Sequence, residues 1–338
     1  MKKLISLILA GLMLLSLTAC GNKNNGNKKE SADSETGKID YAQTNVYVLS
    51  GPTGIGAANL KDKADDGKTE VEYNVTVVAK PNEVVSKISN GEADIAAIAT
   101  NLAANIYNQT KSKVTILAVN TLGVLNVVTP EGVEVTSIAD LKGKKVYTTG
   151  AGSNPEYIIN YLLEKNNIDK TKDLTLEFKA EGTELLTVWA NDPEAVIIAP
   201  QPVATTLTVQ NAGAKIAVDL TDEWEKVGEG SALMMGCVIV RNDFLKDNPE
   251  TVKKFLEEYE ASIKSANEDL DGTAALCEEY GIVAKAAIAK KAIPNCNLCF
   301  ISGNEMKTKL SGYLKVLFDA DQASVGGNLP ADDFYYEK

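Results

Sequence analysis

Residues 91–101 read GEADIAAIATN, a glycine-bounded turn followed by a short apolar run. The run at 94–99 predicts a buried strand, because it is continuous and too short for a helix. The flanking patterns predict helices: Pro81 opens one that Gly91 ends, and a second is expected over 101–109. A buried strand between two helices predicts a mostly parallel sheet that helices cover on both faces.

This alternation of strands and helices forms two successive units along the chain. Further helices follow the second unit to the C-terminus. Two successive α/β units predict two lobes, whose strand ends and helix starts face a ligand cleft. We assign residues 43–122 and the C-terminal helices at 241–338 to lobe I, and residues 123–240 to lobe II. The segments near 120–128 and 236–241 are expected to cross between the lobes. Strands are expected near residues 46–49, 75–79, 94–99, 114–120, 123–128, 145–148, 174–179, 195–199, 215–220 and 237–240.

Residues 1–19 have the pattern of a secretory signal peptide, with a short basic start and an apolar segment. The sequence LTAC at 17–20 resembles the bacterial lipobox, in which the cysteine becomes the lipidated first residue of the mature chain. The resemblance implies a lipid on Cys20 that anchors the chain to the membrane. An ordinary signal peptide with a chance cysteine is the alternative. Residues 21–40 hold almost no apolar side chains, so we expect residues 20–42 to consist of the lipidated cysteine and a flexible tether.

Composition excludes several classes of function. The formal net charge of -12 disfavours nucleic-acid binding. The chain has no histidine, which rules out Ser-His-Asp and Cys-His catalysis and removes the commonest transition-metal ligand. We interpret Arg241, the single arginine, and the acids after it as a solvated surface. Cys296 and Cys299 form a lone CxxC, a weak zinc signal that a strained disulfide or free thiols also explain. We expect no metal and no cofactor.

Three turns resemble those of type II solute-binding proteins: GEADIA at 91–96, DLKGKKV at 140–146, and VRNDFL at 240–245 with NPE at 248–250. The resemblance runs from residue 44 to the C-terminus. It points to the ABC-importer receptors for sulfonates, taurine, nitrate and thiamine-pyrimidine precursors. It implies an α/β, two-lobed type II periplasmic-binding-protein fold, with each lobe a mostly parallel sheet flanked by helices and a ligand cleft between the lobes. These motifs do not identify the ligand.

Three places in lobe I are candidate ligand contacts. The loop at 51–56 is GxxGxG and lacks the spacing of dinucleotide and Walker loops. Its glycines let backbone amides approach a ligand, and in the family this first loop contacts the ligand; a plain tight turn is the alternative. Thr100 and Asn101 lie where a strand ends and a helix begins, and they serve either as ligand contacts or as an N-cap. Asn120 lies at the first expected crossover between the lobes. The candidates in lobe I are Pro52, Thr53, Gly54, Thr100, Asn101 and Asn120.

The loop TTGAGSNP at 148–155 is the strongest candidate in lobe II. It combines hydroxyls, small residues and a helix start, which suit an anion or a carbonyl group. The matching segment in the family binds the polar head of the ligand; an elaborate helix cap is the alternative. Gln201 follows a strand where the family often places a cleft-facing acid or amide, and an exposed Gln201 before a helix-starting Pro202 is the alternative. The candidates in lobe II are Thr149, Gly150, Gly152, Ser153, Asn154 and Gln201.

The resemblance implies an extracytoplasmic receptor that is lipid-anchored to the bacterial membrane and delivers its ligand to an ABC permease and its ATPase subunit. We expect a monomer without catalytic activity. Its ligand is a small sulfonate or carboxylate, or a neutral heterocycle such as a pyrimidine. Two alternatives stay open: a surface protein that binds a ligand without transport, and a carboxylate-based enzyme on the same fold. For the enzyme, Glu181 and Glu184 are candidates, although both also fit as solvated charges at a helix start.

Overall fold

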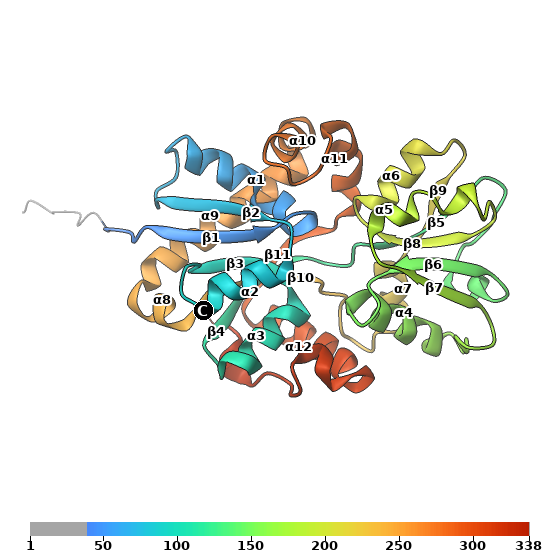
Figure 1. The fold of residues 1–338 in the computed structure, drawn as a ribbon. Helices are drawn as coiled ribbons and strands as arrows, with labels where there is room; N and C mark the ends of the chain where they lie inside the picture. Colours follow the sequence, from blue (N-terminus) through green and yellow to red (C-terminus); the bar gives the residue numbers. More distant parts are fainter. Residues whose placement is uncertain (1–38, 338) are drawn as a thin grey trace, which may run out of the picture. The chain divides into compact units, whose positions relative to one another are not determined.

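The computed structural model describes residues 39–337, which build two mixed β-sheets flanked by helices (Figure 1). Residues 40–338 form one compact unit. The predicted α/β fold with two sheets is therefore confirmed. The predicted signal peptide, the predicted lipid on Cys20 and most of the predicted tether fall on residues 1–38, outside the described part. No helix within 39–337 is both long and apolar enough to span a bilayer.

The first sheet has six strands in the order β11-β4-β10-β3-β1-β2. Strand β1 pairs in parallel with β2 and β3, whereas β10 runs antiparallel to β3 and β4. Strand β11 runs antiparallel to β4, so β10 and β11 oppose the other four strands. The bounds are β1 Thr44–Leu49, β2 Tyr73–Val78, β3 Ile95–Ala99, β4 Val114–Thr121, β10 Gly236–Arg241 and β11 Leu298–Ser302.

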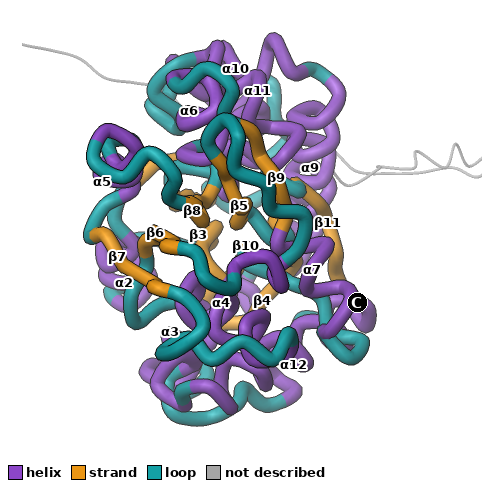
Figure 2. Tube along the Cα trace, turned by 90° about the vertical axis from the view of Figure 1, so that its right-hand side faces the viewer, coloured by secondary structure: helices purple, strands orange, loops and turns teal. Residues whose placement is uncertain are grey.

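The second sheet has five strands in the order β7-β6-β8-β5-β9. Figure 2 shows them running from β7 at the lower left to β9 at the upper right. Strand β6 pairs in parallel with β7 and β8, and β5 alone is reversed, between β8 and β9. The bounds are β5 Leu125–Thr129, β6 Lys145–Thr149, β7 Thr175–Lys179, β8 Val196–Pro200 and β9 Lys215–Asp219.

Helices connect the strands in each sheet, and several begin with proline. Proline lies in the first turn of α1, α2, α4 and α9, where its fixed φ suits a helix and its missing N–H costs no hydrogen bond. The α-helices are α1 Pro52–Asp65, α2 Pro81–Ser89, α3 Thr100–Thr110, α4 Asn154–Lys165, α5 Gly182–Leu185, α6 Val203–Gln210, α7 Leu220–Val227, α8 Asn242–Asp247, α9 Pro249–Glu268, α10 Leu270–Glu279, α11 Ala286–Ala292 and α12 Gly303–Ala320. Short 3₁₀ helices cover Ile138–Leu141, Val188–Ala190, Ile293–Asn295, Gln322–Val325 and Asp332–Phe334.

The apolar run of β3 explains why the six-stranded sheet is covered on both faces. Ile95 and Ala97 belong to one hydrophobic core, and Ala96 and Ile98 belong to another. All four are essentially inaccessible to solvent. Because successive side chains of a strand point to opposite faces, a continuous apolar run buries both of them.

Two chain segments connect the sheets: residues 122–124 between β4 and β5, and residues 228–235 between α7 and β10. Near the second segment, the ring of Trp224 on α7 packs edge-to-face on Tyr313 of α12, with centroids 5.5 Å apart. Both side chains are fully buried and belong to one core that continues from one sheet to the other. This core therefore joins the two sheets beside the connecting segments.

Two features of the six-stranded sheet differ from the sequence prediction. Residues 123–240 were assigned to lobe II, yet β10 pairs with β3 and β4. Strand β11 was not predicted, because the pattern after Pro249 is helical on both sides of it. Both strands pair antiparallel with residues distant in the chain, and a local pattern carries no information on such pairing.

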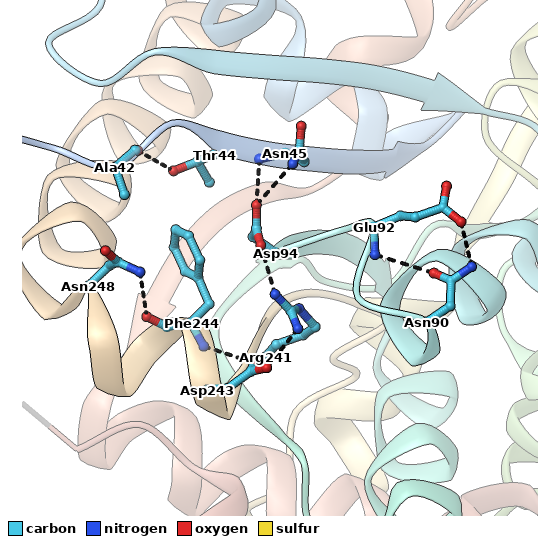
Figure 3. A network of polar contacts seen from close by, with 10 residues as sticks. All are labelled: Ala42, Thr44, Asn45, Asn90, Glu92, Asp94, Arg241, Asp243, Phe244 and Asn248. Atoms are coloured by element: carbon cyan, nitrogen blue, oxygen red, sulfur yellow. Dashed lines mark hydrogen bonds and ion pairs between the residues drawn. The ribbon is translucent and has the colours of Figure 1, made fainter.

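The interpretation of Arg241 as a solvated surface residue is wrong. Its side chain is only 20% exposed, and Nη2 lies 3.0 Å from Oδ1 of the buried Asp94 (Figure 3). Asp94 also accepts a hydrogen bond from the backbone N–H of Asn45 at 2.9 Å, and Nη1 of Arg241 contacts Asp243 at 2.8 Å. This network ties β1, β3 and β10 together, so the single arginine stabilises the sheet.

Candidate ligand-binding site

The predicted ligand contacts lie at strand ends and helix starts in both sheets. Helix starts carry backbone N–H groups that have no partner within the helix, so they suit a polar ligand. In the six-stranded sheet, Pro52, Thr53 and Gly54 form the first turn of α1, Thr100 and Asn101 begin α3, and Asn120 lies near the end of β4. In the five-stranded sheet, Thr149 ends β6, Gly150, Gly152 and Ser153 precede α4, Asn154 begins α4, and Gln201 lies between β8 and α6.

Thr53 and Asn120 meet at Gly236 of β10. A Cβ atom on Gly236 would lie 2.5 Å from Oδ1 of Asn120 and 2.9 Å from Cγ2 of Thr53, so a larger residue would collide with both. Thr100 reaches the adjoining backbone, because its hydroxyl donates to the carbonyl oxygen of Met234 at 2.6 Å. The structure therefore brings three predicted contacts, from α1, α3 and β4, to one short segment.

The amide of Asn120 is already engaged within the protein. Its Nδ2 donates to the hydroxyl of Tyr259 at 2.8 Å, and its Oδ1 accepts from the hydroxyl of Thr121 at 3.0 Å. Tyr259 is completely buried, and this burial raises the pKa of its phenol. Asn120 thus has a clear structural role in linking β4 to α9.

Gln201 is likewise buried, at 3% exposed, and is engaged on both sides of its amide. Its Nε2 donates to Oδ1 of Asn126 at 2.8 Å, and its Oε1 accepts from the hydroxyl of Thr205 at 2.8 Å. The sequence did not predict a role for Asn126, which is the second residue of the reversed strand β5. The signal in the sequence was an asparagine among the apolar side chains of Leu125, Val127 and Val128.

The loop from Thr149 to Ser153 has a backbone that only glycine adopts easily. Gly150 and Gly152 have φ values of 85° and 68°, in the left-handed region. The hydroxyl of Ser153 donates to the carbonyl oxygen of Gly150 at 2.7 Å. The N–H of Gly152 donates to Oε2 of Glu156 at 2.8 Å, so a carboxylate of the chain itself caps this loop.

Asn154, the first residue of α4, differs from the other predicted amides. Its side chain is 5% exposed. Both Oδ1 and Nδ2 are buried, and neither has a hydrogen-bond partner. Buried amides are nearly always paired in folded proteins, so an unpaired one at a helix start marks a place for a ligand or a water molecule.

Two polar contacts that the sequence reading missed connect elements of the two sheets. The hydroxyl of Tyr157 on α4 donates to Oδ2 of Asp321, directly after α12, at 2.9 Å. Burial and this carboxylate raise the pKa of Tyr157 to about 12. Asn297, before β11, donates from Nδ2 to the carbonyl oxygen of Gly123 at 2.7 Å. Asn297 is one of the two residues between the cysteines of the CxxC.

The two groups of predicted contacts stay separate. Among residues 39–337, no hydrogen bond joins the cluster around Gly236 to the loop at 149–154 or to Gln201. A cavity of about 800 Å³ lies between α4, residues 228–231 and α12, and its lining includes none of the predicted contacts. A second cavity of about 360 Å³ adjoins Arg241.

The arrangement offers hydrogen-bonding groups and little reactive chemistry. The thiols of Cys237, Cys277, Cys296 and Cys299 are free, and burial raises the pKa of each. Glu181 and Glu184, the candidate catalytic carboxylates, each accept a hydrogen bond from the backbone N–H of the other and so cap α5. Within the described residues, no cluster of three acidic or cysteine side chains could hold a metal ion.

The chain is similar to known proteins in sequence and in fold. The family described as NMT1/THI5 like matches residues 70–271. An ABC transporter protein from Parabacteroides distasonis has a TM-score of 0.73 at 24% identity, over 87% of this chain and 99% of that chain. The periplasmic aliphatic sulphonate binding protein SsuA from Escherichia coli has a TM-score of 0.68 at 10% identity, over 87% and 92% of the two chains. The alkanesulfonate-binding protein SsuA from Xanthomonas axonopodis pv. citri, bound to MOPS, has a TM-score of 0.59 at 13% identity, over 87% and 96%. No curated protein sequence matches the chain.

Proposed function

This chain belongs to the NMT1/THI5-like family, and from that membership we propose that it is the solute-binding receptor of an ABC importer. The observation that carries the proposal is the placement of helix starts. Helices α1, α3 and α4 begin at strand ends of two sheets that two chain segments connect. Proteins with the same fold include an ABC transporter protein and periplasmic sulfonate-binding proteins.

The receptor works outside the cytoplasm, as a monomer anchored by a lipid on Cys20. The support is the sequence LTAC at residues 17–20 after an apolar segment. Two or more acyl chains hold a protein stably at a membrane, whereas one chain binds only marginally. The lipid keeps the receptor close to its permease and the ATPase subunit.

The ligand is a small organic molecule, a sulfonate or carboxylate or a pyrimidine-like heterocycle, and it binds by lobe closure. We assign its contacts to the candidate residues at the starts of α1, α3 and α4, together with Asn120 and Gln201. A ligand that touches both lobes has a higher affinity for the closed state and shifts the population toward it. The permease then accepts the closed receptor. No bond is made or broken in this chain.

Native mass spectrometry of the full-length protein, extracted in mild detergent, tests ligand binding. We expect a bound small molecule whose identity then defines an uptake assay with the labelled compound. Cells that lack the chain should lose that uptake, and the wild-type gene should restore it. Unchanged uptake in the deletion strain would contradict a transport role and favour a surface protein that binds without importing.

A Cys20→Ser variant tests the anchor separately. The lipidated protein should partition with membranes and carry the added mass of acyl chains. The variant should lose both properties while its folded part still binds the same compound. A membrane-bound Cys20→Ser protein would contradict lipid anchoring and leave the binding function intact.

A further inference from the structure

The start of α4 already carries a negative charge that belongs to the chain. The N–H of Gly152 donates to Oε2 of Glu156 at 2.8 Å. Backbone donors at a helix start attract anions, so this donor would be a natural partner for a sulfonate or carboxylate ligand. Glu156 occupies that position, and an anionic ligand would have to displace it.

A second carboxylate lies close to the same loop. The hydroxyl of Tyr157 donates to Oδ2 of Asp321 at 2.9 Å, and it lies 3.4 Å from the carbonyl oxygen of Gly152. Burial raises the pKa of the Tyr157 phenol, and the carboxylates of Asp321 and Glu156 raise it further. No lysine or arginine within residues 39–337 forms an ion pair with Glu156 or Asp321. An anion at this loop would therefore approach two carboxylates that accept hydrogen bonds but have no cationic partner in this part of the chain, and like charges repel each other.

Asn154 supplies the complementary observation. Asn154 is the first residue of α4 and directly follows the loop at 149–153. In a helix each Cα–Cβ bond tilts toward the N-terminus, which is the end where this loop lies. The amide of Asn154 is buried with both Oδ1 and Nδ2 unpaired. A carboxamide needs an acceptor for its N–H and a donor for its oxygen. A sulfonate or carboxylate offers acceptors alone and would leave Oδ1 unpaired.

We propose that Asn154 selects a neutral or cationic ligand group with a hydrogen-bond donor beside an acceptor, as in an amide, an amidine or an amino-substituted nitrogen ring. Glu156 and Asp321 exclude anionic ligands from the same place. This inference rests on the proposed function and narrows its ligand class. It separates the chain from the sulfonate-binding proteins that share its fold.

Two matched series of probes test the ligand class on the full-length protein by calorimetry. The first series is nicotinamide, nicotinate and pyridine-3-sulfonate, and the second is propanamide, propanoate and ethanesulfonate. Within each series the skeleton is closely similar and the polar group changes. The amide should bind at least about tenfold more tightly than either anion, a difference of about 1.4 kcal/mol. The variant Asn154→Leu should abolish this preference, and Glu156→Gln should improve binding of the anions.

Thermal unfolding of Asn154→Leu tests the unpaired amide without any ligand. Leucine has a similar size, and replacing an unpaired buried amide by an apolar group costs little or stabilises. The unfolding midpoint should stay level or rise. Gln201→Leu is the matched control: its amide is paired with Asn126 and Thr205, so its midpoint should fall. If no probe binds, the unfolding midpoints of these two variants decide whether the Asn154 amide lacks a partner within the protein.

Tighter binding of the anions in both series would overturn the inference and leave a solute-binding protein. A midpoint for Asn154→Leu that falls as far as that of Gln201→Leu would also overturn it, because the amide then has a structural partner. The uptake assay in the deletion strain tests the proposed function separately.

Discussion

The side-chain amide of Asn297 donates a hydrogen bond of 2.7 Å to the carbonyl oxygen of Gly123, where the chain leaves the six-stranded sheet for the five-stranded one. The same Nδ2 lies 3.2 Å from the hydroxyl of Thr221 and 3.3 Å from Oδ2 of Asp219. The carbonyl oxygen of Asn297 accepts from the N–H of Leu122 at 3.1 Å. One residue therefore fixes a connecting segment to the start of α7.

Replacing Asn297 should weaken this attachment. Its φ is 47°, so Asn297→Gly keeps the backbone and removes the amide, with an expected loss of about 1–3 kcal/mol in the free energy of unfolding. Asn297→Ala should lose about 1 kcal/mol more, because alanine strains a left-handed backbone. Asn295→Ala is the control, since its hydrogen bond to Lys291 is solvent-exposed. Urea unfolding measures all three, and equal losses at the two positions would contradict the role of Asn297.

Gly123→Ala should destabilise the same connection by overpacking. Its Cβ would lie 2.2 Å from the hydroxyl oxygen of Thr221 and 2.6 Å from Cδ2 of Leu233. Such crowding costs about 1–3 kcal/mol or more. Gly56→Ala is the comparison, because its Cβ would lie 3.2 Å from Ile263 and alanine gains helix propensity there. Equal stability of Gly123→Ala and Gly56→Ala in urea would contradict the predicted overpacking at Gly123.

Removing Arg241 should cost more than removing its exposed partner. Arg241→Met leaves Asp94, with 9% of its side chain exposed, without its counter-charge, and breaking a buried pair costs about 3–5 kcal/mol. Asp243→Asn removes the second partner, whose side chain is 68% exposed, and should cost about 1 kcal/mol or less. Denaturant unfolding compares the two variants. Similar losses would mean that Asp94 is hydrated rather than buried.

Alkaline pH should release the contact between Tyr157 and Asp321. Burial and the carboxylate raise the pKa of Tyr157 to about 12 in the folded chain, against about 10 in the unfolded chain. A raised pKa contributes stability that is present below the unfolded value and is lost as the pH rises through the folded one. The stability difference between the wild type and Tyr157→Phe should therefore shrink between pH 10 and pH 12. A constant difference across that window would show that Tyr157 does not titrate there.

The four described cysteines should resist thiol reagents while the chain is folded. Cys237, Cys277 and Cys296 are buried, Cys299 is partly exposed, and all four are free. The thiolate is the reactive form, and burial raises the pKa of Cys277 and Cys299 to about 12. At pH 8 labelling should be slow, with Cys299 first, and should become fast in denaturant. Failure of Cys296 and Cys299 to react even when unfolded would reveal a disulfide between them.

The local pattern was enough to predict most elements of the fold. The run at residues 94–99 gave a strand buried on both faces, and proline positions gave several helix starts. The strand at 237–240 was predicted but assigned to lobe II, and β11 was missed, because the antiparallel partners of both strands lie far away in the chain. The ion pair between Asp94 and Arg241 was not predicted for the same reason, because the two residues lie far apart in the chain.

The sequence predicted the candidate site as a set of helix starts. It did not predict which of the polar side chains there are hydrogen-bonded within the protein. The sequence could indicate Asn120, Asn154 and Gln201 as amides near a ligand. It could not indicate that Tyr259 and Asn126 engage two of them while Asn154 stays unpaired. Hydrogen-bond pairing depends on distances between distant segments, and only coordinates supply these distances.

Small-angle X-ray scattering tests the central claim, that a solute closes the two lobes, most directly. The compound found by native mass spectrometry is removed from the full-length protein by dialysis and then added back to saturation. The account predicts a smaller radius of gyration with the compound than without it, and the Asn297→Gly variant should change the ligand-free value. An identical scattering curve with and without a saturating bound compound would contradict lobe closure.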